Sequence, residues 1–193
     1  MRTIPLAAVV LLIAAPAAAK DPQPRTLYSG YDPSPAFPFG RLNPDAPPQT
    51  SQFAFMIGEF DCIDRRRRKG SDPWHVEHGK WNAAYYLNGM AILDRGYNET
   101  YAVSNVRIFD AKAGLWKVTY FSPGEPGGVW AGRKEGSDMV LKREWGGGDT
   151  PRVHSRLAFS HITPKSFEWV AEHRIGAEKN WTATWKISCT RAH

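Results

Sequence analysis

The sequence of 193 residues lacks most signatures of catalysis, metal binding and membrane insertion. It has no Gly-x-Ser-x-Gly, no His-Glu-x-x-His and no phosphate-binding glycine loop that leads into a helix, so we assign no catalytic residue and expect no cofactor. The spacing of His75 and His78, and of His154 and His161, places each pair on opposite faces of an expected strand, which argues against a metal site. No run after the first 19 residues is apolar enough to cross a bilayer, so no transmembrane segment is predicted.

The N-terminal residues 1–19 have the layout of a secretory signal peptide. Arg2 precedes an apolar core from Ile4 to Ala15, and three alanines come directly before Lys20. No cysteine follows the apolar core, so lipid attachment there is not expected. We predict that the mature protein is periplasmic or secreted. The alanine-rich style favours a bacterial periplasm and leaves eukaryotic secretion open.

The net charge of the chain is +6 at pH 7, and its one basic run is Arg65–Lys69. Such a run attracts anionic ligands, lipid headgroups or nucleic acid. The turn signal Gly70-Ser71-Asp72-Pro73 that follows favours a simpler interpretation, a charged hairpin tip that protects a sheet edge. No basic groove with interleaved aromatics and no known nucleic-acid motif accompanies it, so we expect no nucleic-acid partner.

Residues 20–51 are rich in proline, which excludes a central strand or a helix interior. We predict an extended arm that is either loose or laid over the domain through its aromatic residues. A role of this arm in contacting an envelope partner is one functional alternative, that of an interaction module. The remaining residues, 52–193, are predicted to form one β-barrel domain.

From Phe53 onward apolar and polar residues alternate with a period of two, and turn signals recur every eight to twelve residues. Asn88-Gly89 is the clearest hairpin signal. The last two strands alternate most regularly, with Phe167 to Ile175 and Trp181 to Cys189 each presenting one apolar and one polar face. About ten short strands without a long helical pattern predict an all-β fold, a single closed antiparallel up-and-down barrel. A sandwich is the alternative architecture.

The two cysteines lie in the first and last expected strands. If these strands run antiparallel with Phe60 opposite Arg191, then Cys62 falls opposite Cys189, because both pairs sum to the same index, and all four side chains share one face. An even number of cysteines in an exported chain favours a disulfide. A redox-active or nucleophilic cysteine is the competing interpretation, although neither residue lies in a Cys-x-x-Cys pair.

The segment Phe53-Ala54-Phe55-Met56-Ile57-Gly58-Glu59-Phe60 resembles the opening of the DUF1579-type family of uncharacterised proteins. The resemblance continues through Leu87–Met90 and Phe109–Trp116 to the end strand that closes on Arg191. That family is similar to lipocalins and other calycins, barrels that bind small apolar ligands. The resemblance implies that Phe60 takes the place of a tryptophan across the barrel floor, with Arg191 packed over it as a structural pair.

Aromatic side chains on the inward parity predict an apolar cavity with a few orienting hydrogen bonds. His173 is the sharpest single candidate, because it shares a face with Phe167 and Trp169. The predicted function is non-catalytic binding of a small hydrophobic or amphipathic ligand inside the barrel. The enzyme alternative acts on an apolar substrate with His173 as base near Tyr85 or Tyr120. The oligomeric state is not predicted. The candidate ligand-binding residues are Trp81, Tyr85, Trp116, Tyr120, Trp130, Trp169, His173 and Trp185.

Overall fold

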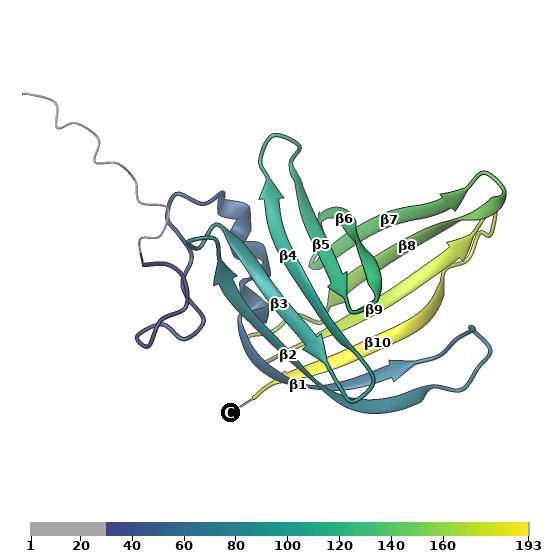
Figure 1. Ribbon diagram of the computed structural model, residues 1–193, viewed down its shortest axis with the longest axis horizontal. Coiled ribbons are helices and arrows are strands. Elements are labelled where there is room, and N and C mark those ends of the chain that lie inside the picture. The colour runs from purple at the N-terminus through teal and green to yellow at the C-terminus, as the bar shows by residue number, and fades with distance from the viewer. Residues whose placement is uncertain (1–29, 193) are drawn as a thin grey trace, which may run out of the picture.

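A computed structural model describes residues 30–192 (Figure 1). The predicted signal peptide and the first part of the arm lie outside the described residues. One 3₁₀ helix precedes ten strands that close into a single antiparallel barrel in which each strand pairs with its sequence neighbours, and β1 pairs with β10. The all-β, closed up-and-down fold class predicted from the sequence is therefore confirmed. The elements are η1 (Pro48–Met56), β1 (Gly58–Arg66), β2 (His75–Tyr86), β3 (Ala91–Tyr97), β4 (Ala102–Asp110), β5 (Leu115–Ser122), β6 (Glu125–Glu135), β7 (Asp138–Gly147), β8 (Thr150–Ser160), β9 (Ser166–Ile175) and β10 (Thr182–Arg191).

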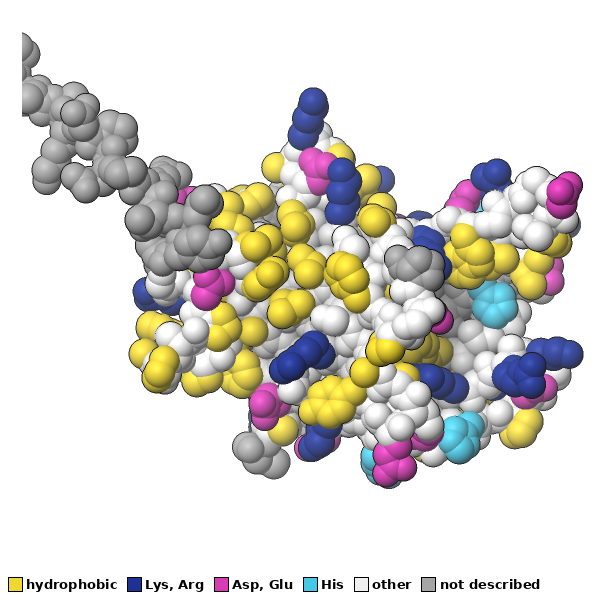
Figure 2. Space-filling view, viewed as in Figure 1, with side chains coloured by type: hydrophobic (Ala, Val, Ile, Leu, Met, Phe, Trp, Pro, Cys, Tyr) yellow, Lys and Arg dark blue, Asp and Glu magenta, His cyan; other side chains and the backbone are white. Residues whose placement is uncertain are grey.

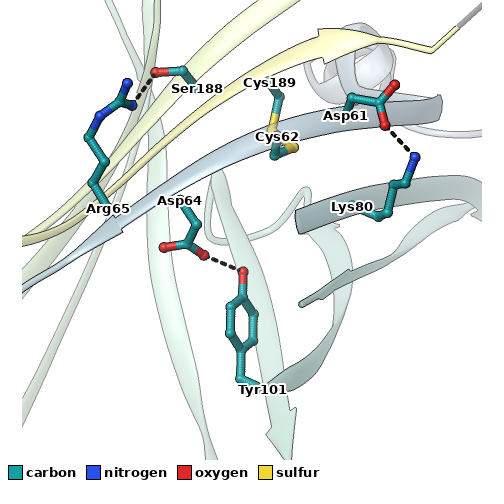
Figure 3. The surroundings of a disulfide bond; sticks show 8 residues. All are labelled: Asp61, Cys62, Asp64, Arg65, Lys80, Tyr101, Ser188 and Cys189. Carbon is teal, nitrogen blue, oxygen red and sulfur yellow. Dashed lines mark hydrogen bonds and ion pairs between the residues drawn. A yellow bond between two sulfur atoms is a disulfide. The ribbon is translucent and has the colours of Figure 1, made fainter. Parts of the chain in front are cut away.

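The seam of the barrel is the antiparallel pair β1 and β10, which lie side by side in Figure 1. Phe60 is opposite Arg191, and Cys62 is opposite Cys189, as the index sum predicts. The two cysteines form a disulfide bond (Figure 3). Their side chains are 5% and 2% exposed and belong to the barrel core. The first and last strands are therefore joined both by their backbone ladder and covalently.

The helix η1 corrects the sequence analysis, which extended the period-two pattern to Phe53. Pro48 opens this helix, where its missing N–H and fixed φ cost nothing. Phe53 and Met56 are fully buried against the barrel strands. The alternation therefore starts at Gly58, and the helix fills one end of the barrel.

A second correction concerns the last strand, where Trp181 and Ala183 were expected on the same face as Trp185. The register of β10 with β9 shifts between Ala183 and Trp185. Such a bulge inserts a residue and reverses the alternation beyond it. Trp181 consequently stacks against the guanidinium groups of Arg156 and Arg174, whereas Trp185 points into the barrel.

Arg191 stabilises the closed end of the barrel, which is filled by η1 together with Phe60, Trp116 and Phe159 and is called the floor below. Its guanidinium carbon lies 4.5 Å from the centre of the Phe60 ring, as the family resemblance implies. Nη1 donates to the carbonyl of Ile57 at 2.7 Å, Nη2 to that of Phe55 at 3.2 Å and Nε to that of Pro164 at 3.0 Å. One half-buried cation thus satisfies carbonyls from the end of η1, from the approach to β1 and from the turn before β9.

The described part of the arm, residues 30–47, lies against the β2–β3 turn. Phe39 accepts a hydrogen bond from the backbone of Tyr85 at 2.9 Å, and the side chain of Asn43 donates to the carbonyl of Asn88 at 3.0 Å. The turn has positive φ angles at Leu87, Asn88 and Gly89, which confirms the predicted Asn-Gly hairpin.

The outer wall is not uniformly polar. Figure 2 shows hydrophobic side chains gathered over β2 to β5, on the same side as the arm. Tyr97 on β3, Ile108 on β4 and Phe121 on β5 are among the exposed large apolar side chains. Within the described residues, no helix is long and apolar enough to span a membrane.

Replacing both cysteines tests the covalent part of the seam. The double variant Cys62→Ser/Cys189→Ser loses a link between residues 127 positions apart. We expect it to fold with native far-UV circular dichroism and to lose about 4–5 kcal/mol of unfolding free energy, because the unfolded chain is no longer constrained. Urea denaturation measures this loss, and wild type treated with dithiothreitol is the control that should match it. A loss below about 1 kcal/mol would contradict this role of the disulfide.

The variant Gly58→Ala tests the floor. Gly58 has φ +123°, and a Cβ atom at this position would collide with the Arg191 guanidinium. We expect a loss of about 3 kcal/mol, since backbone strain adds to the displaced arginine hydrogen bonds. Gly114→Ala is the matched control, because its φ is also positive and no atom lies near the added methyl group. Equal losses in urea denaturation for the two variants would show that Arg191 adjusts freely.

Candidate ligand-binding cavity

A cavity of about 340 Å³ lies inside the barrel. Residues from every strand from β2 to β10 line it, so it is enclosed by the wall and bounded on one side by the aromatic floor. This volume is at the lower end of the range for small-molecule pockets. The barrel interior therefore has two parts: one end is filled by the packed aromatic core, and the rest contains the cavity.

The structure brings six of the eight predicted residues to the cavity wall. Tyr85 and Trp116 lie elsewhere. Trp116 is fully buried in the floor, packs edge-on against Phe53 with ring centres 4.7 Å apart, and donates its indole N–H to Gln52 at 3.0 Å. Tyr85 belongs to the same core cluster. The six residues at the cavity are Trp81, Tyr120, Trp130, Trp169, His173 and Trp185.

Aromatic rings in edge-to-face contact form much of the cavity wall near the seam. The ring centres of Trp169 and Trp185 are 5.0 Å apart, and those of Trp185 and Tyr101 are 5.2 Å apart. This arrangement is favourable for aromatic quadrupoles and presents flat apolar faces. Trp81, also on the wall, has an indole N–H that is buried and finds no acceptor in the described part of the chain.

The base of the cavity holds a buried ion pair. Arg107 is 2% exposed, and its Nε donates to Asp94 at 2.5 Å. Asn105 donates to the other Asp94 oxygen at 2.8 Å. The Arg107 guanidinium also lies against the rings of Phe53 and Phe159, at 4.8 and 5.2 Å. Asp94 thus balances the charge, but Nη1 of Arg107 remains buried without a hydrogen-bond partner among the described residues.

Polar side chains follow one row of the inner wall across three neighbouring strands. Arg143 on β7 is opposite Ser155 on β8, and Ser155 is opposite His173 on β9. His173 Nδ1 lies 3.4 Å from Thr184 Oγ1, and either tautomer is compatible with this contact. Nothing acidic hydrogen-bonds to the His173 ring within residues 30–192, and the same range contains no cluster of three or more potential metal ligands.

A carboxyl–phenol pair joins buried Asp64 on β1 to half-buried Tyr101 at the cavity wall. Tyr101 donates its hydroxyl to Asp64 at 2.7 Å (Figure 3). Arg66 lies 3.4 Å from the other Asp64 oxygen. The Arg66 guanidinium is stacked between Tyr101 and Trp185, at 3.8 and 4.0 Å from their ring centres. Burial raises the pKa of the Asp64 carboxyl, and Tyr101 and Arg66 offset the rise only in part. Burial, followed by the bond to Asp64, also raises the pKa of Tyr101.

Sequence reasoning missed the polar part of the lining. It selected aromatics on the inward parity and treated charged residues as outward-facing. Arg143 nevertheless shares the inward parity of Met139 and Leu141, and Ser155 that of Leu157 and Phe159. The signal was therefore present in the alternation. Tyr101 precedes β4 and had no such signal.

The topology and the cavity define the class of the protein: a lipocalin-like closed β-barrel with an interior pocket. No family model and no curated protein matches the chain, so the resemblance to the DUF1579-type family is not supported. A similar solved structure is the S-type phycobiliprotein lyase from Guillardia theta, with 12% sequence identity, a TM-score of 0.44, and coverage of 73% of this chain and 90% of that chain. A likeness at this level says nothing about what the cavity binds.

The variant Asp64→Asn tests the environment of the buried carboxyl. Because the pKa of Asp64 is raised on folding, the folded protein binds this proton more tightly than the unfolded chain. From about pH 4 upward, the contribution of Asp64 to stability should therefore fall as the pH rises through the folded pKa. Asparagine does not ionise, so the stability of wild type minus that of the variant should shrink between pH 4 and 7.

Urea denaturation at a series of pH values measures this difference. Asp61→Asn, which removes an exposed carboxylate from the same strand, is the matched control. A wild-type advantage that grows with pH would show that attraction to Arg66 outweighs the cost of burial.

Proposed function

We propose that the protein is an exported β-barrel that binds a small hydrophobic or amphipathic molecule in its interior, without catalysis. The observation that carries this proposal is the tryptophan-lined cavity of about 340 Å³, whose wall includes buried donors that have no hydrogen-bond partner among the described residues. Folded interiors pair nearly all their buried polar groups. Donors left unpaired beside a cavity are suited to a bound molecule that supplies the acceptors.

The shape of the wall supports an apolar ligand body. Trp169, Trp185 and Trp81 present large ring surfaces, and side chains such as Leu157 and Ile187 complete the apolar lining. The volume equals that of about eleven water molecules in the liquid. It therefore suits a fully enclosed ligand of about a dozen non-hydrogen atoms, and longer molecules would extend through the cavity mouth.

The site residues proposed for ligand contact are the six that line the cavity. Tyr85 and Trp116 are assigned instead to support of the floor, given their contacts with the core cluster. Their effect on a ligand would be indirect.

Export is supported by the disulfide. A buried cysteine pair that joins the first and last strands persists in an oxidising compartment and would be reduced in most cytosols. The Met1–Ala19 pattern points to the same compartment.

The proposal omits catalysis because no acid among residues 30–192 hydrogen-bonds to the His173 ring. A histidine base is normally held and polarised by a carboxylate or a comparable acceptor. The contact of His173 in the described chain is with the Thr184 hydroxyl. This environment suits hydrogen bonding to a ligand.

Filling the cavity tests the proposed function. In Ala171→Trp, an indole replaces a methyl group on the cavity wall. We expect a Kd for decan-1-ol at least tenfold weaker than that of wild type, because the added ring occupies the ligand volume. Isothermal titration calorimetry measures the affinity, with intrinsic tryptophan fluorescence against a lipid and porphyrin panel as a second readout.

The matched control is Ala131→Trp, the same substitution at an exposed position on β6. It should bind as wild type does. If folded wild type binds none of the probes, or if both variants retain full affinity, the interior is not a ligand site.

A further inference from the structure

The polar row on the inner wall consists of Arg143, Ser155 and His173. Its cation, Arg143, is held by aromatic rings and not by carboxylates. The Arg143 guanidinium lies 4.5 Å from the centre of the Trp145 ring and 5.2 Å from that of Trp130. No carboxylate of the described chain lies within ion-pair distance of it. Cation–π contacts orient a guanidinium and leave its charge and its N–H groups available.

Gly128 makes room for this arginine. A side chain at position 128 would occupy the place of the Arg143 guanidinium. Glycine is therefore required on β6 for the guanidinium to lie along the cavity wall. The position of Arg143 is fixed by three neighbours on β6 and β7, as expected for a preorganised binding group.

Ser155 and His173 extend the same row. Cross-strand neighbours have Cβ atoms about 4.5–5.5 Å apart, so the three side chains form one continuous group. Ser155 is 6% exposed and lines the cavity, and its hydroxyl makes no hydrogen bond to the described residues. When Thr184 donates to Nδ1 of His173, the proton of the ring is on Nε2, which is then a further donor.

The other charged side chains that line the cavity each have a hydrogen-bond partner in the described chain. Arg107 is paired with Asp94, and Glu172 accepts from the Nε of Arg156 at 2.6 Å. Glu125 is exposed and accepts from the hydroxyl of Tyr120 at 3.3 Å. Arg143 is thus the cavity cation without a countercharge in the described chain.

From this row we infer that the ligand is a carboxylate-bearing amphiphile, whose carboxylate binds Arg143 and Ser155 beside His173 while its apolar body lies against Trp169 and Trp185. This inference rests on the ligand-binding function proposed above. A guanidinium and a hydroxyl match the two oxygens of a carboxylate. A phosphate monoester, with a larger charge and three terminal oxygens, would call for more cationic donors than this row provides.

Two probes of equal chain length separate the head group from the body. Decanoate and decan-1-ol share the apolar chain and differ at the head. On wild type at pH 7.5 we expect decanoate to bind at least tenfold more tightly, measured by isothermal titration calorimetry. In Arg143→Gln, decanoate should lose at least tenfold in affinity, the range of one charge-assisted hydrogen bond, while decan-1-ol changes less than twofold.

Lys142→Gln is the matched control, because it removes a positive charge from the adjacent, exposed position of β7. It should keep the wild-type preference. Arg143→Lys retains the charge without the planar fork and should keep part of the preference. Ser155→Ala should weaken decanoate about threefold to tenfold.

Equal binding of the two probes to wild type, or equal losses in Arg143→Gln and Lys142→Gln, would overturn the carboxylate site and leave the proposed function standing. Binding of neither probe would contradict the proposed function itself. If decyl phosphate binds more than tenfold more tightly than decanoate, the inferred head group is a phosphate and the carboxylate inference is wrong.

Discussion

The barrel depends on the antiparallel pairing of its first and last strands. A ten-stranded meander has two open edges, and each edge would expose a row of unpaired backbone groups. Pairing of β1 with β10 removes both edges at once. The register of this one ladder also decides which side chains face inward, because a slip of one residue would turn Cys62, Asp64 and Phe60 outward. The floor, the cavity and the buried seam cluster all follow from it.

The two parts of the interior are distinguished by the helix that precedes β1. The rings and side chains of η1 fill the space next to Phe60, Trp116 and Phe159, and Arg191 holds the backbone of that region. Beyond this floor, no segment of the described residues enters the barrel, and the wall has polar side chains between the tryptophans. Close packing therefore stabilises one end and leaves the other end hollow.

The alternation of inward and outward residues was predictable because it is a local sequence pattern. Closure of the barrel was predictable because the pairs Phe60–Arg191 and Cys62–Cys189 have the same index sum, as an antiparallel ladder requires. The position of a residue along the barrel axis was not predictable in the same way. Tyr85 and Trp116 have the correct inward parity, yet they lie in the floor, because the packing of η1 decides which end is filled. The predicted orientation of Trp181 was wrong because of the bulge near Ala183. The residues on both sides of the bulge alternate regularly, so the sequence does not reveal it. Arg143 and Ser155 also have the inward parity, but alternation alone does not tell whether a polar residue at such a position lines a cavity or interrupts the pattern.

Two buried donors at the cavity carry an energetic cost. A buried donor without a partner costs about 1–3 kcal/mol, and neither Trp81 Nε1 nor Arg107 Nη1 has a hydrogen-bond partner among the described residues. A barrel built only for its own stability would replace them with apolar groups of similar shape, as buried ion pairs and polar groups often tolerate. Arg143 is different, because cation–π contacts with Trp130 and Trp145 hold its guanidinium and no carboxylate of the described chain pairs with it. Under the proposed function, Trp81 and Arg107 would favour molecules with hydrogen-bond acceptors, whereas Arg143 would favour a negative charge, so the cavity would recognise acceptors and charge through different side chains.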